Sequence, residues 1–310
     1  MSKIGFIFPG QGSQSIGMGH DIYENFGVAR ELLNDSSDIC KIDFKNLLFN
    51  ENENINISEF TQPAIVLNSF MILLALKERL DLKQNFSLGH SLGEFSALGA
   101  NGAIGLEETI RLVNLRGKFM QEACEGKGAS MMVILGLDDE KIEQICSAAR
   151  KYGAQIWAAN YNCDGQIVVA GLKNDLQNAE ANFKEAGAKR AMLLNMSVAS
   201  HCPILKTACD KLTAEIEPII KDGFLKVIAN VNAKPYNTKK EALMLLEEQL
   251  VKPVLYKQSI KNVEDEVDFF VEIGSSVLKS MNKKITQKPT YSIYDISSLD
   301  EFCKMIEERY

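Results

Sequence analysis

Apolar runs and polar, helix-like stretches alternate along the first third of the chain. The segment KIGFIFPG reads as a short apolar strand that Pro9 and Gly10 end. The periodicity predicts a long helix over 57–80, with a second start at Pro63, because proline fits the first turn of a helix. A second apolar strand, NFSLGHS, ends at Gly89 and leads into LGEFSALGANGA, a predicted helix of small residues.

The same alternation continues with a strong helix over 106–123 and resumes late in the chain. There we predict a helix over 203–220, the strand VIANV, a helix over 240–250, the strand DFFVEIG, and a last strand and helix. Strands that alternate with helices favour a parallel sheet covered on both faces. The expected fold class is therefore α/β.

The pattern changes character over 129–195. Here the strand ASMMVILG precedes the helix DDEKIEQICSAARKYG, the consecutive strands AQIWAANY and GQIVVAG, the helix KNDLQNAEANFKEAG and the strand RAMLLN. The order βαββαβ is that of the ferredoxin-like unit, which can bury a core of its own. We assign 128–195 to a small ferredoxin-like insert, and 1–127 together with 196–310 to one large α/β domain.

Composition and charge narrow the class of protein. The 310 residues are 46% hydrophobic and 24% charged, which is the balance of an ordinary globular protein. The net charge of −7 argues against a nucleic-acid binder, which normally has a basic stripe. The start, MSKIGFIFPGQG, lacks the design of a signal peptide, and we expect no apolar run of membrane-span length.

The cysteines and histidines favour neither a disulfide framework nor a zinc site. Seven cysteines are present without a CxxC pair, and there are only three histidines. We expect reduced thiols and a cytoplasmic location. Cys202 has two interpretations, a reactive thiol or a buried packing residue, and the second is favoured.

Ser91 lies between two glycines in GHSLG, at the predicted passage from strand to helix. Gly89 and Gly93 would allow a tight turn that presents the serine oxygen at the helix start, where backbone amides can stabilise an oxyanion. A simple helix-capping serine explains the pentapeptide alone equally well. The strand before it and the helix after it favour a nucleophile.

Three histidines are candidates for the base that a nucleophilic serine needs. His90 is adjacent to Ser91, and adjacent side chains leave such a turn in different directions. His20 lies in a polar, glycine-rich loop and reads as a surface residue. His201 alone follows Ser91 in the chain, the order found in hydrolase-like folds, although a structural histidine remains an alternative.

One arginine of the helix over 106–123 lies within an apolar stripe. Arg116 falls in line with Leu112 and Phe119 at helical spacing, whereas Arg111 follows Glu107 by four residues and has an ion-pair explanation. Arg116 either binds an anion or extends its charged end from the apolar face to solvent.

Six motifs then point to one family. FPGQGSQ at the N-terminus, GHSLGE, RG at 116, NYN at 160–162, SHC at 200–202 and QL at 249 resemble malonyl-CoA:acyl carrier protein transacylases of type II fatty-acid synthesis. The resemblance covers essentially the whole chain. It implies a hydrolase-like large domain with a ferredoxin-like insert.

The resemblance also implies roles for individual residues. Ser91 would be the nucleophile and His201 its base, with no triad acid. The backbone carbonyl of Gln249 would orient the histidine, so that many side-chain substitutions at Gln249 would be tolerated. The backbone amides of Gln11 and Leu92 would bind the oxyanion. Arg116 would hold the substrate's free carboxylate.

The implied reaction moves a malonyl group between two thiols. Malonyl-CoA would acylate the serine, and the phosphopantetheine thiol of holo acyl carrier protein would remove the group in a ping-pong cycle that supplies fatty-acid elongation. No cofactor or metal is implied. We expect a monomer that contacts neither nucleic acid nor membrane.

The chain departs from the family at two places. EIGSS replaces the usual Gly-Pro-Gly after the late strand, and Ala199 stands where bacterial members often carry proline. Two other interpretations stay open at this point. One is a serine hydrolase of the same broad geometry, which would normally add a triad acid, and the other is a non-catalytic protein that recognises acyl carriers.

Overall fold

A parallel sheet forms the centre of the larger part of the molecule. The computed structural model describes residues 2–196 and 198–309, and this sheet has the strand order β10-β9-β1-β2-β7-β8. All pairs are parallel except β7 with β8. The strands are β1 (Ile4–Phe8), β2 (Phe86–Gly89), β7 (Val227–Ile228), β8 (Pro235–Tyr236), β9 (Phe269–Ile273) and β10 (Thr290–Ile293).

The central strands are buried on both faces, as expected for a parallel sheet covered by helices. In β1, Phe6 and Phe8 join the larger apolar core, whereas Ile7 points to a second core that includes Ile260 of one helix and Leu278 of another. The larger core is built with the helices α1 (His20–Asn25), α2 (Gly27–Cys40), α3 (Phe44–Phe49), α4 (Ser58–Arg79), α5 (Leu92–Ala100), α6 (Leu106–Cys124), α9 (Lys206–Ile216), α10 (Lys239–Gln249) and α13 (Ile296–Arg309).

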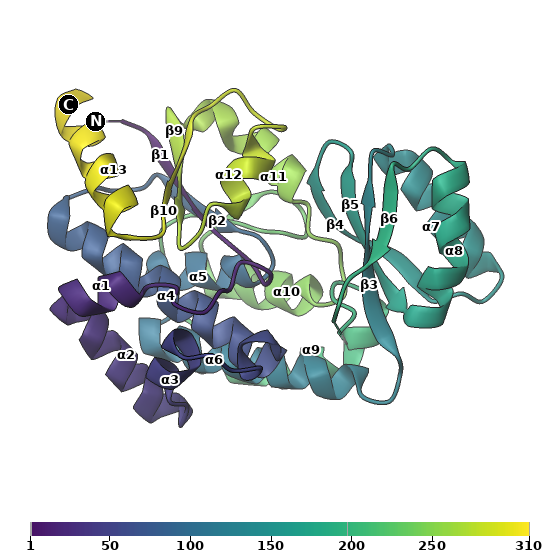
Figure 1. Cartoon of the computed structure of the whole chain (residues 1–310), viewed down its shortest axis with the longest axis horizontal. Helices are drawn as coiled ribbons and strands as arrows, with labels where there is room; N and C mark the ends of the chain where they lie inside the picture. The colour runs from purple at the N-terminus through teal and green to yellow at the C-terminus, as the bar shows by residue number, and fades with distance from the viewer. Residues whose placement is uncertain (1, 197, 310) are drawn as a thin grey trace.

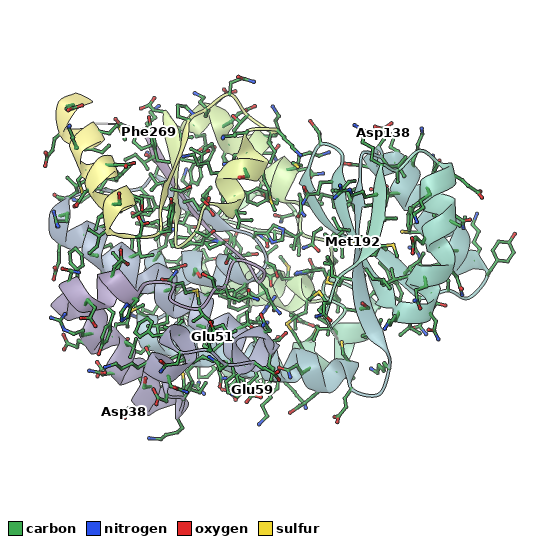
Figure 2. All side chains as sticks on the ribbon, in the orientation of Figure 1. Asp38, Glu51, Glu59, Asp138, Met192 and Phe269 are labelled. Atoms are coloured by element: carbon green, nitrogen blue, oxygen red, sulfur yellow. The ribbon has the colours of Figure 1, made fainter. Side chains whose placement is uncertain are left out.

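The second core lies under α11 (Tyr256–Val263) and α12 (Val277–Asn282). Three short 3₁₀ turns complete the large unit: η1 (Asn54–Asn56), η2 (Pro203–Leu205) and η3 (Glu264–Glu266). Figure 2 shows Phe269 of β9 in this larger part, and Asp138 and Met192 in the smaller one.

The smaller part is a four-stranded antiparallel sheet of order β4-β5-β3-β6. Its strands are β3 (Ala129–Leu135), β4 (Ile156–Cys163), β5 (Gln166–Leu172) and β6 (Arg190–Leu193), and α7 (Asp139–Lys151) and α8 (Lys173–Glu185) cover one face (Figure 1). The chain order is the βαββαβ order expected from the sequence. The domain limits 1–127, 196–310 and 128–195 stay a prediction.

Three expectations about single elements are wrong. The helix α4 runs through Pro63 without a second start, because the carbonyl of Glu59 that the proline leaves without a donor accepts from Asn114 Nδ2 at 2.8 Å. The helix expected over 203–220 is a 3₁₀ turn followed by α9, which ends at Ile216, two residues before Pro218. The strand VIANV is paired only at β7, because the chain turns back at once into β8.

One helix also corrects the expectation about apolar length. Among the described residues, α4 is long and apolar enough to cross a membrane, with a mean hydropathy of 1.4 over its most apolar window. However, 83% of that window is buried inside the molecule. The apolar length of α4 is therefore accounted for by packing in the core.

Candidate active site

Ser91 stands at a sharp turn between β2 and α5. Its backbone has φ 52° and ψ −102°, which an L-residue adopts only where the surroundings impose it. A Cβ atom at Gly89 would lie 2.0 Å from the backbone of Gly93, and one at Gly93 would lie 2.1 Å from the carbonyl of Phe8. The two glycines are thus required by close backbone approach at this turn.

His201 is the histidine that reaches the serine. Its Nε2 lies 2.7 Å from Ser91 Oγ, and its Nδ1 lies 2.7 Å from the backbone carbonyl of Gln249. A carbonyl can only accept, so Nδ1 carries the proton and Nε2 is free to accept one from the hydroxyl. Burial, together with the nearby charge of Arg116, lowers the pKa of His201 to about 3. The imidazole is therefore neutral at physiological pH, the form required of a base.

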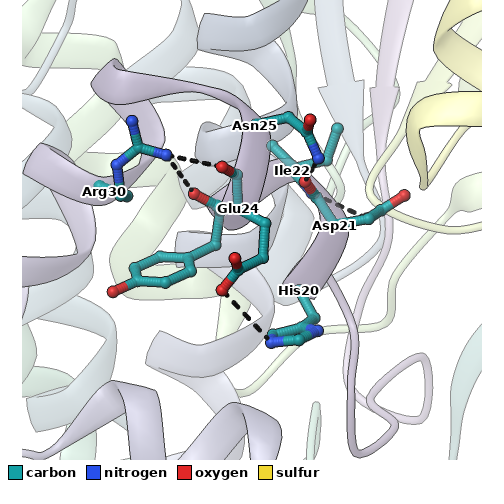
Figure 3. Close-up of polar contacts among 7 residues, drawn as sticks. His20, Asp21, Ile22, Glu24, Asn25 and Arg30 are labelled. Carbon is teal, nitrogen blue, oxygen red and sulfur yellow. Dashed lines mark hydrogen bonds and ion pairs between the residues drawn. The ribbon is translucent and has the colours of Figure 1, made fainter.

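The other two histidines do not contact the serine hydroxyl. His90 is turned away from it, with Nε2 2.7 Å from Asn162 Oδ1 and its ring against Tyr256. His20 lies at the surface, where it pairs with Glu24 at 3.7 Å (Figure 3).

Arg116 is buried rather than extended to solvent, with 1% of its surface exposed. Its guanidinium donates to Gln62 Oε1 at 2.8 Å, to Gln249 Oε1 at 3.1 Å and to Ser91 Oγ at 3.2 Å. Burial lowers the pKa of Arg116 to about 10, so it stays charged at neutral pH. A fixed positive charge next to a nucleophile suits an anionic substrate.

Arg111 has an ion-pair explanation, but with another partner than expected. Its guanidinium pairs with Glu215 of α9 at 3.2 Å, and no contact with Glu107 is found among the described residues. The ion pair joins two helices instead of one helical turn.

Gln249 contributes more than its carbonyl. Its side chain is fully buried, and Nε2 donates to Glu94 Oε2 at 2.8 Å and to the carbonyl of Ser91 at 3.1 Å. Its Oε1 accepts from Arg116. The expectation that many side chains would be tolerated here did not include these three hydrogen bonds, all of which an apolar replacement would remove.

The site opens into a cavity of about 200 Å³. Gln11 and Leu92 line it together with Ser91, Arg116 and His201. Leu92 is the first residue of α5, so its amide has no acceptor within the helix. The Gln11 side chain is turned aside and donates to Ser58 Oγ at 3.0 Å, which leaves the role assigned to its backbone amide a prediction.

Asn160 and Asn162 of β4 line the same cavity, which therefore lies between the two sheets. The start of α12, which follows the EIGSS loop, closes one side of it through Val277 and Leu278. Buried Glu272 accepts from the amide of Leu278 at 3.0 Å and from Ser275 Oγ at 2.5 Å. The loop that lacks Gly-Pro-Gly is thus held by a carboxylate.

The cysteines were expected to be reduced, and Cys202 to be a buried packing residue. All seven cysteines are free thiols, and Cys202 is fully buried, where burial raises its pKa to about 12. Within the described part of the chain, no group of three or more His, Cys, Asp or Glu side chains could hold a metal ion.

Three polar residues of the site, Gln62, Glu94 and Asn230, were not predicted. Glu94 was detectable, because it is the only ionisable residue in an otherwise small and apolar helix. Asn230, which accepts from the Ser91 amide at 2.7 Å, lies in the segment misread as strand and gave no signal.

Comparison with known proteins gives consistent matches along the chain. A family model for the acyl transferase domain matches residues 5–301. A malonyl CoA-acyl carrier protein transacylase of Bacillus subtilis is 36% identical over 313 residues, covering 99% of this chain and 98% of that protein. One of Haemophilus influenzae is 38% identical over 307 residues, covering 97% and 98%.

Solved structures match equally well. The crystal structure of malonyl-CoA:acyl carrier protein transacylase from Helicobacter pylori superposes with a TM-score of 0.96 at 43% identity, over 100% of both chains. A malonyl-transacylase in complex with a holo type II PKS acyl-carrier protein superposes with a TM-score of 0.94 at 35% identity, over 98% of this chain and 100% of that one. The likeness thus extends to both parts of the molecule.

Proposed function

Because the chain belongs to the malonyl-CoA:acyl carrier protein transacylase family of acyl transferases, we propose that Ser91 carries the malonyl group between the two thiols. The enzyme transfers malonyl from malonyl-CoA to acyl carrier protein for fatty-acid synthesis. The main support for the role of Ser91 is a pair of hydrogen bonds. One joins Ser91 Oγ to His201 Nε2 and the other joins His201 Nδ1 to the Gln249 carbonyl, each at 2.7 Å.

In the first half-reaction, Ser91 Oγ attacks the thioester carbonyl of malonyl-CoA while His201 Nε2 takes the hydroxyl proton. The negative charge on the tetrahedral oxygen is stabilised by the backbone amides of Gln11 and Leu92. When the C–S bond breaks, the imidazolium returns the proton to the coenzyme A sulfur. The products are free coenzyme A and a malonyl ester on Ser91.

The second half-reaction is the same chemistry in reverse order. The phosphopantetheine thiol of holo acyl carrier protein gives its proton to His201 and attacks the ester carbonyl. Collapse of the tetrahedral intermediate returns the proton to Ser91 and leaves malonyl on the carrier. Because coenzyme A leaves before the carrier thiol attacks the malonyl ester on Ser91, the cycle is ping-pong.

Arg116 is proposed to select malonyl over acetyl. Its Nη2 lies 3.2 Å from Ser91 Oγ. If the guanidinium binds the free carboxylate of a malonyl group, the thioester carbonyl of the same group therefore lies close to the nucleophile. An acetyl group offers no such anion and would leave the buried charge without its partner.

Arg116→Ala is expected to lower kcat/KM for malonyl-CoA about 100-fold, since a charge-assisted contact contributes roughly 2–3 kcal/mol. Acetyl transfer should hold steady or rise, because the variant removes a charge that acetyl cannot pair. Acylation rates with malonyl-CoA and acetyl-CoA, measured on the wild type and the variant, test this. Arg111→Ala, which removes an arginine from the outer side of the same helix, is the matched control.

A parallel fall with both donors would refute the carboxylate role of Arg116. It would mean that the arginine acts only through packing.

The proposal extends to the partners, the oligomeric state and the location of the enzyme. Holo acyl carrier protein and malonyl-CoA are the partners, and the enzyme acts as a cytoplasmic monomer away from nucleic acid and membranes. In support, the net charge is −7 and the cysteines are free.

A further inference from the structure

Glu94 is buried one turn after Ser91, with 1% of its surface exposed. Three donors from separate elements enclose its carboxylate. Oε2 accepts from the amide of Asn230 at 3.0 Å and from Gln249 Nε2 at 2.8 Å, and Oε1 accepts from the Tyr236 hydroxyl at 2.9 Å. A carboxylate held from three sides has one position, and it fixes the position of each donor in turn.

Gln249 connects Glu94 to the working groups of the site. Because Glu94 Oε2 accepts from Nε2, the other end of the amide, Oε1, faces the Arg116 guanidinium. In the opposite orientation, the NH₂ group of Gln249 would face the Arg116 cation, and its carbonyl oxygen would face the Glu94 carboxylate, so neither hydrogen bond could form. The backbone carbonyl of the same residue holds His201. Gln249 therefore contacts two of the groups that act on the substrate, Arg116 through its side-chain amide and His201 through its backbone carbonyl.

Asn230 is a second connection, and it leads to the nucleophile itself. The backbone amide of Asn230 donates to Glu94. Its side chain bonds the serine turn twice: Oδ1 accepts from the Ser91 backbone amide at 2.7 Å, and Nδ2 donates to the Gly89 carbonyl at 2.7 Å. These bonds hold the turn on which Ser91 has its positive φ, a conformation that persists only where neighbours impose it.

We propose that Glu94 is a positioning residue, which orients Gln249 and Asn230 and through them aligns the base, the arginine and the serine turn. The inference rests on the roles proposed for Ser91 and His201. Glu94 does not line the cavity, so it acts through its neighbours and not on the substrate.

The hydrogen-bond acceptor, and not the charge, is the feature of Glu94 that positioning requires. Burial raises the pKa of Glu94 to about 7, and the described titratable groups that face it are Arg116 of α6 and Tyr236 of β8. A proton on Oε1 would face the Tyr236 hydroxyl, which can turn and accept it, while Oε2 keeps both donors. A glutamine whose carbonyl takes the place of Oε2 keeps the donors Asn230 and Gln249, and its NH₂ group donates to the Tyr236 hydroxyl, so Glu94→Gln should preserve the function that Glu94→Ala removes.

The test is the single-turnover rate of acyl-enzyme formation, followed by intact mass with malonyl-CoA and acetyl-CoA. Glu94→Ala is expected to slow acylation about 10- to 100-fold with both donors, and more with malonyl, because the base and the arginine both lose alignment. Glu94→Gln should stay within about threefold of the wild type. Asn101→Ala is the control, because Asn101 ends the same helix and its buried amide donates to the carbonyl of Lys226 at 2.7 Å, away from the site.

The proposal is overturned if Glu94→Ala acylates as fast as Asn101→Ala, or if Glu94→Gln is as slow as Glu94→Ala. Either result, with a wild type that gains the malonyl mass, leaves the function of Ser91 intact. A wild type that gains no mass would instead refute the function proposed for Ser91.

A second variant keeps the proposal testable if Glu94→Ala does not fold. Gln249→Met retains the backbone carbonyl and similar volume but removes the amide between Glu94 and Arg116. We expect malonyl acylation to fall more than acetyl acylation. An unchanged donor preference would contradict the connection from Glu94 to Arg116.

Discussion

Ser91→Ala is expected to fold like the wild type and to take no acyl group from malonyl-CoA. The Ser91 hydroxyl oxygen is the atom that forms the ester, and it is the group that His201 Nε2 contacts at 2.7 Å. The backbone of the turn is held by Asn230 and the two glycines, which the substitution leaves in place. Intact mass after brief exposure to malonyl-CoA, with circular dichroism as the check on folding, measures both parts of this result.

Ser96→Ala is the matched control. Ser96 lies on the same helix, is fully buried and has no hydrogen-bond partner for its hydroxyl in the described part of the chain. This variant should gain the malonyl mass like the wild type. A folded Ser91→Ala protein that still gains it would remove the nucleophile assignment.

His201→Ala should slow acylation about 10³- to 10⁴-fold, in the upper range of what a general base contributes. Without the imidazole, the hydroxyl has no acceptor for its proton at 2.7 Å. His90→Ala is the control, because the ring of His90 bonds Asn162 and packs on Tyr256 without touching the serine hydroxyl. Its effect should come through stability and stay small in the folded protein.

The pH dependence follows from the same contacts. Since burial and Arg116 lower the pKa of His201 to about 3, the base is neutral above that pH and is lost only as the pH falls through that value. Acylation by the wild type should therefore show no loss from protonation of His201 between pH 5 and 8.

If His90→Ala slowed the chemical step more than His201→Ala in folded protein, the assignment of His201 as the base would be wrong.

Much of the fold could be predicted from the hydrophobic periodicity of the sequence and from the glycines and prolines that end its elements. The strands at Ile4 and Phe86 are mostly apolar and buried throughout because helices cover both faces of the sheet, and β3 to β6 occur in the predicted order. The pattern predicted none of α1 to α3, and it misjudged the ends of elements where a distant residue decides. Asn114 supports α4 past Pro63 from another helix, which no local pattern shows.

The candidate site also contains residues that the sequence predicted and residues that it could not. Ser91, His201 and Arg116 stand in motifs or at helical spacing, so residue type and position were enough to propose them. The side chain of Gln249 could not be predicted, because its importance depends on Glu94 and Arg116, which lie 155 and 133 residues away in the chain. Glu94 was visible as a lone charge in an apolar helix, but its partners come from segments that only the fold brings together.

The central claim is that Ser91 holds malonyl for a thiol and not for water. The most direct measurement isolates the acylated enzyme from malonyl-CoA, adds holo acyl carrier protein without coenzyme A, and follows both masses over time. The account predicts that the malonyl mass leaves the enzyme and appears on the carrier, while enzyme kept without a thiol retains it for minutes. Release of free malonate at the same rate with and without carrier, and no gain of mass on the carrier, would contradict it.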